Sequence, residues 1–214
     1  MTFFSFKKRP SKTGVTLTEL LVVIAIIVII STIMVINFRA GEKGGELVRS
    51  AQLVVQGIRK AQSMSLGSKE NKHPTTGNWE VPEGSYGVYI ALSSPNQYII
   101  FADFFVADPD TENDQYNSGE EIETVELERG IIIEHLRYQP SNGKPNKTNI
   151  NFDPIDPLIK LVPPMPPANE INITLKREEV TDCGSDCQEG VAGSCPEGCK
   201  VVKLLKAGWV SIVD

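Results

Sequence analysis

One segment near the N-terminus constrains the fold more than any other feature of the chain. Residues 15–36 form a stretch of 22 residues, of which 17 are apolar. As an α-helix rising about 1.5 Å per residue, this stretch would be roughly 33 Å long, close to the bilayer's hydrocarbon thickness of about 30 Å. No other apolar run exceeds about five residues. The sequence therefore predicts a single transmembrane helix, which we place at residues 15–40, in an otherwise aqueous chain.

The charges flanking this segment predict its orientation. Residues 1–14 carry four basic residues and no acid, whereas the net charge of the 214-residue chain is −6, so the remaining 200 residues sum to −10. The positive-inside rule places residues 1–14 in the cytoplasm and the residues after about 40 outside it. An acidic balance of this size argues against nucleic-acid binding. A cleaved secretory signal has a shorter apolar region of about 7–15 residues, so an uncleaved anchor is the simpler alternative.

The junction between the basic leader and the apolar segment reads KTGVTLTELLV, residues 12–22. The leader ends in Gly14, the apolar segment follows at once, and Glu19 lies five residues past the glycine. This junction resembles the leader of type IV pilins and pseudopilins. The resemblance implies that a prepilin peptidase cuts after Gly14, that the new amine of Val15 is methylated, and that Glu19 serves filament assembly. Two departures are Val15, where the family usually has Phe, and the lack of a helix-bending proline between Pro10 and Pro74.

Glu19 has two interpretations, which are compatible with each other. A carboxylate inside a bilayer costs about 2.5–3.5 kcal/mol on insertion scales, which indicates a cationic partner, and the Val15 amine of a neighbouring subunit is suitable. Alternatively, Thr16 and Glu19 have the spacing of a capping box, in which Glu19 also interacts favourably with the helix dipole.

Beyond the membrane segment, the sequence predicts an α+β fold in which a long N-terminal helix packs on an antiparallel β-sheet head, as in pilins. Residues 41–68 are the amphipathic half of the helix, kinked or loosened near the glycines at 41–45. Their apolar positions follow helical spacing: Leu47, Val48, Ala51, Val54, Val55, Ile58, Ala61 and Met64.

Residues 69–214 form the head. We predict strands at 86–92, 97–102, 123–128, 131–138, 148–152, 170–176, 200–206 and 209–213, antiparallel because no helices separate them. The proline-rich stretch 163–167 is interpreted as a stiff connector.

Parts of the exported portion also resemble the GspH/FimT-like pseudopilins and minor pilins. The resembling stretches are residues 58–63, 98–103 and 116–122, which read IRKAQS, YIIFAD and YNSGEEI.

Ten acids and no base occupy residues 103–128. Within the acidic loop 103–121, oxygen-bearing side chains alternate, and such a loop can wrap a Ca²⁺ ion, which takes six to eight oxygen ligands. Some pseudopilins bind Ca²⁺, and the candidate ligands are Asp108, Asp110, Asp114 and Glu120. The alternative is a solvated acidic loop, because the central glycine of an EF-hand is missing.

Four cysteines lie in the loop 183–199, at Cys183, Cys187, Cys195 and Cys199. Outside the cytoplasm disulfides persist, and zinc sites more often show tighter Cys-x2-Cys spacing. We therefore predict two disulfides, with a zinc site or free thiols as alternatives. Three pairings are open.

The sequence has no recognised enzyme motif, and we expect a non-enzymatic protein. His73 and His135 are interpreted as surface or structural residues.

The predicted function is a structural subunit, a minor pilin or pseudopilin, which waits in the cytoplasmic membrane with its head outside before it joins a type IV pilus or a type II secretion-like filament. Expected partners are the prepilin peptidase, other pilin subunits, the inner-membrane assembly platform and membrane lipid. The rival is a binding or sensor module with an uncleaved anchor.

Overall fold

The computed structural model describes residues 15–82, 84–104, 115–140, 143–153, 159–162 and 169–213, without the side chains of residues 33–44 and 186. The chain divides into two compact units, residues 1–42 and residues 43–214. The predicted leader 1–14 and the proline-rich connector 163–167 lie outside the described residues.

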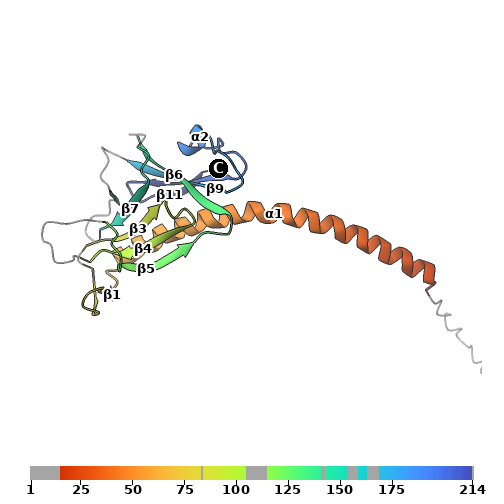
Figure 1. Ribbon diagram of the computed structural model, residues 1–214, viewed down its shortest axis with the longest axis horizontal. Helices are drawn as coiled ribbons and strands as arrows, with labels where there is room; N and C mark the ends of the chain where they lie inside the picture. Colours follow the sequence, from red (N-terminus) through yellow and green to blue (C-terminus); the bar gives the residue numbers. More distant parts are fainter. Residues whose placement is uncertain are drawn as a thin grey trace, which may run out of the picture. The chain divides into compact units, whose positions relative to one another are not determined.

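Helix α1 is assigned from Leu17 to Leu66 (Figure 1). The helical assignment runs through residues 41–45, where the sequence predicts a kink or loosening, and the division between the two units falls inside this stretch. Among the described residues, no helix is long and apolar enough to cross a membrane. The membrane segment at residues 15–40 therefore stays a prediction.

In the second unit, one face of α1 is buried. The buried positions recur at helical spacing, as predicted: Leu47, Ala51, Val54, Val55, Ile58, Ala61 and Met64. Val48 was predicted on the same stripe but is 37% exposed. Each residue turns by about 100° around a helix of 3.6 residues per turn, which leaves Val48 at the edge of the buried face.

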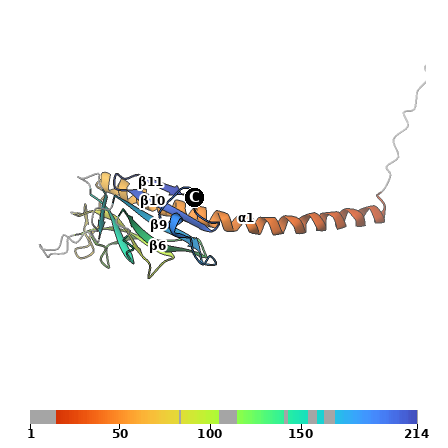
Figure 2. The same ribbon diagram turned by 90° about the horizontal axis from the view of Figure 1, so that it is seen from above.

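Two antiparallel sheets make up most of the described part of the second unit. The first has the order β5-β4-β3-β7-β8, with bounds β3 Tyr86–Ala91, β4 Gln97–Ala102, β5 Glu121–Glu126, β7 Lys147–Phe152 and β8 Ile159–Val162. The second has the order β11-β10-β9-β6 (Figure 2), with bounds β6 Ile131–Gln139, β9 Glu170–Arg177, β10 Cys199–Leu205 and β11 Val210–Val213. A short hairpin pairs β1 (Asn71–Lys72) with β2 (Trp79–Glu80).

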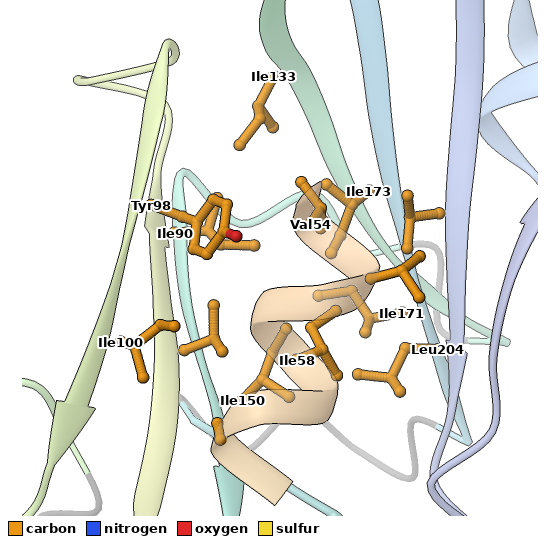
Figure 3. Close-up of a cluster of buried hydrophobic side chains, with 14 of the residues drawn as sticks. Val54, Ile58, Ile90, Tyr98, Ile100, Ile133, Ile150, Ile171, Ile173 and Leu204 are labelled. Carbon is orange, nitrogen blue, oxygen red and sulfur yellow. The ribbon is translucent and has the colours of Figure 1, made fainter. Parts of the chain in front are cut away.

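The hydrophobic core of the second unit lies where α1 passes between the two sheets (Figure 3). Ile58 is fully buried, with Ile100 and Ile150 on the side of the first sheet and Ile171 on the side of the second. At about 25 cal/mol per Å² of apolar surface removed from water, such burial is the main stabilising contribution to a head of this kind.

The α+β class and the antiparallel sheets agree with the prediction, and every predicted strand has an observed counterpart. Strands β1, β2 and β8 and the short helix α2 (Ser185–Gln188) were not predicted. They have two to four residues each, which is too short for a periodic hydrophobic pattern to stand out.

Candidate assembly site at the start of helix α1

The first turn of α1 is capped by a threonine. The backbone N–H of Glu19 donates a hydrogen bond to Oγ1 of Thr16 over 3.2 Å, and the hydroxyls of Thr16 and Thr18 lie 3.1 Å apart. This is one half of the predicted capping box. In the described part of the chain, the carboxylate of Glu19 does not make the reciprocal bond to the N–H of Thr16. Its negative charge at the helix N-terminus therefore remains available to a partner.

Between Leu20 and Ile30, the exposed surface of α1 is apolar on every side. Its exposed apolar residues run from Leu20, which is 60% exposed, to Ile30, which is 53% exposed. They are Leu20, Leu21, Val22, Val23, Ile24, Ile26, Ile27, Val28, Ile29 and Ile30. The hydroxyl of Thr32 donates to the carbonyl of Val28 over 2.8 Å, so this polar group is already paired inside the helix. An apolar surface of this extent indicates burial against lipid or other protein surfaces.

The predicted processing residues lie at one end of this surface. Val15 is 71% exposed just before the helix, and Glu19 is exposed in its first turn. Gly14, after which cleavage is predicted, lies outside the described residues.

Of the four predicted Ca²⁺ ligands, Asp108, Asp110 and Asp114 lie outside the described residues. Glu120 is buried, and its two oxygens accept backbone hydrogen bonds from Phe104 (3.3 Å) and Asn117 (2.8 Å). Burial raises the pKa of Glu120, and the hydrogen bonds from Asn117 and Phe104 partly offset this rise. Glu120 therefore holds its own turn together, and Ca²⁺ binding stays a prediction.

The cysteine loop forms two nested disulfides among the described residues, Cys183–Cys199 and Cys187–Cys195. The disulfide prediction is thus confirmed, and the zinc and free-thiol alternatives are wrong, because the four thiols are paired with one another. Cys183, Cys187 and Cys199 are buried in a small cluster with Val201. The bridges fasten helix α2 and its flanking turns to strand β10.

Sequence reasoning did not find one group of metal-ligand side chains. The structure brings His135 together with Glu134 and Asp182, with one ligand atom of each lying within 4.8 Å of the others. Asp182 is remote in sequence from the other two, so no spacing motif signals the group.

Comparison with known proteins gives one result for the N-terminal region. Residues 9–35 match the prokaryotic N-terminal methylation motif. No curated protein and no solved structure matches the chain. The matched residues contain the end of the basic leader, Gly14, Val15, Glu19 and most of the apolar segment. This is consistent with the type IV pilin and pseudopilin family.

Proposed function

We propose that the protein is a structural subunit, a minor pilin or pseudopilin, of a type IV pilus or a type II secretion-like filament. The observation that carries this proposal is the methylation motif at residues 9–35, which includes the start of a helix whose apolar residues from Leu20 to Ile30 are exposed on all sides. The protein waits in the cytoplasmic membrane as a single-pass subunit with its head outside. After cleavage following Gly14 and methylation of Val15, it joins the filament with no enzymatic activity of its own.

Assembly follows from two interactions of different kinds. The aliphatic surface of α1 leaves lipid and packs among the helices of neighbouring subunits, which keeps it away from water. The carboxylate of Glu19 pairs with the N-terminal amine of Val15 in a neighbour. Because an unpaired carboxylate is unfavourable in an apolar environment, this pair fixes the axial register of one helix against the next.

The head supplies specificity in this proposal. Its contact surfaces include the loop fastened by the two disulfides, whose backbone is held in place ready for partner subunits. The resemblance of residues 58–63 and 98–103 to GspH/FimT-like proteins supports a minor or pseudopilin role. These stretches lie in α1 and at β4, both of which contribute to the core.

A second candidate is a binding or sensor module on an uncleaved anchor. The observation that favours it is the hydrogen bond from the N–H of Glu19 to Thr16, since a helix cap needs no filament to explain it. In that case the carboxylate of Glu19 would be dispensable.

The test compares two variants in the first turn of α1. Glu19→Gln removes the charge but keeps the shape of the side chain. Thr16→Ala removes the cap, which costs about 1 kcal/mol, but keeps the carboxylate. We expect Glu19→Gln to insert in the membrane normally and to be absent from sheared filaments, whereas Thr16→Ala is incorporated. Equal incorporation of Glu19→Gln and the wild type would refute the pairing of Glu19 with an amine.

A further inference from the structure

The second sheet contains a β-bulge that places two polar side chains together. Along the pairing of β6 with β9, Ile133 lies opposite Leu175 and His135 opposite Thr174, so Glu134 is the extra residue. In a regular strand, neighbouring side chains point to opposite faces, whereas a bulge sets two residues against one and redirects them. As a result, Oε2 of Glu134 lies 3.9 Å from Nε2 of His135.

A lysine brings the cysteine loop to this bulge. Nζ of Lys176 lies 2.6 Å from Oε1 of Glu134, and it donates a hydrogen bond to the carbonyl of Thr181 over 3.3 Å. Lys176 pairs across the sheet with Cys199, whose disulfide to Cys183 fixes the residue that follows Asp182. The carboxylate of Asp182 is thereby held near Glu134 and His135.

One carboxylate oxygen of this group is buried without a hydrogen-bond partner among the described residues. This oxygen is Oε2 of Glu134. Lys176 occupies only the other oxygen, Oε1. The hydrogen bonds from Gly184 and Gln188 to Asp182 both use Oδ1, which leaves Oδ2 for another interaction. A buried carboxylate oxygen without a partner is costly, and a cation beside it removes that cost.

We propose that Glu134, His135 and Asp182 bind a divalent transition-metal ion of the Zn²⁺ class. One imidazole nitrogen and two carboxylate oxygens are ligands that Zn²⁺ accepts, and three protein ligands leave one position for water. Lys176 holds the carboxylate of Glu134 in orientation, as the outer partners of metal ligands commonly do. Asp182 is exposed, so the ion reaches the site directly from solvent. The bound ion joins the bulge of β6 to the loop that the disulfides fasten.

The test uses the full chain in detergent, purified without a histidine tag, treated with EDTA and titrated with ZnCl₂ by calorimetry. Titration with Co²⁺, followed by visible absorption, reports the ligand field at the site. His135→Gln and Asp182→Asn are the test variants. His73→Gln is the matched control, because His73 is the other histidine and lies in the hairpin of β1 and β2, outside the group.

We expect one Zn²⁺ per wild-type chain, at least tenfold weaker binding by both test variants, and unchanged binding by His73→Gln. The Co²⁺ absorption should disappear with His135→Gln, because this variant removes the nitrogen ligand. A Ca²⁺-like site in the acidic loop offers only oxygen ligands, so binding there would not depend on His135. Absence of stoichiometric Zn²⁺ binding by the wild type would overturn the proposal. So would equal binding by His135→Gln and the wild type. If His135→Gln does not fold, Asp182→Asn decides, because Asp182 is an exposed loop residue.

Discussion

Replacing Gly57 by alanine tests how closely α1 packs on the first sheet. Gly57 lies in the buried half of the helix, and a Cβ atom built there would come within 2.5 Å of the ring of Tyr98. Tyr98 is 2% exposed, and its hydroxyl donates a hydrogen bond to the carbonyl of Leu53 over 2.6 Å. The ring therefore has little room to move away without losing this bond.

The magnitude follows from two opposing effects. An alanine in a helix is more favourable than a glycine by about 0.8–1.0 kcal/mol. Overpacking a well-packed core costs about 1–3 kcal/mol, and displacing Tyr98 also weakens its bond to Leu53, worth about 1 kcal/mol. We expect Gly57→Ala to lower the free energy of unfolding by about 1–3 kcal/mol.

Gly45 in the same helix provides the matched control. Among the described residues, a Cβ atom there would meet the end of the Arg49 side chain alone, at 3.5 Å, so Gly45→Ala should raise the free energy of unfolding by up to about 1 kcal/mol. Urea unfolding in detergent, followed by tryptophan fluorescence, measures both variants. In the double variant Gly57→Ala, Tyr98→Leu, the cost of Gly57→Ala should largely vanish, because the ring it meets is gone. A Gly57→Ala protein as stable as Gly45→Ala would refute the packing described here.

Three further predictions concern the head. Replacing Cys183 and Cys199 together by serine opens a bridge that spans 16 positions, and should lower the free energy of unfolding by about 3 kcal/mol in the same urea assay, relative to the wild type with both disulfides formed. Burial raises the pKa of Glu120 above its unfolded value of about 4.3. The stability that protonated Glu120 contributes is therefore fully present below about pH 4.3 and is lost as the pH rises through the folded pKa. Urea unfolding from pH 4 upward should show the wild type losing stability relative to Glu120→Gln, and parallel curves would contradict this. The ion pair of Lys60 and Glu123 joins side chains that are 46% and 43% exposed, so a double-mutant cycle should give a coupling below about 1 kcal/mol that shrinks further in high salt.

The strands of the head were predictable because their signals are local. Apolar residues alternate or cluster between turn-forming residues, as at Ser94 to Asn96 between β3 and β4. The buried face of α1 was predictable for the same reason, since its apolar residues recur at helical spacing. Val48 shows the limit of that signal, because hydrophobicity alone does not place the edge of a buried face.

The features that could not be predicted depend on contacts between residues remote in sequence. Four cysteines allow three pairings, and only the folded loop selects Cys183 with Cys199. No single strand has a sequence pattern that indicates the passage of α1 between two sheets. The same holds for Asp182 beside the bulge at Glu134, which requires both the register of β6 against β9 and the closure of the loop.

The central claim, that the leader is removed and the helix is kept for assembly, is tested most directly by the N-terminus of the mature protein. Intact mass and N-terminal peptide sequencing of the chain, purified from cells with an active prepilin peptidase, should give a protein that begins with N-methylated Val15 and retains the apolar segment. A mature protein that still begins at Met1 would contradict the account.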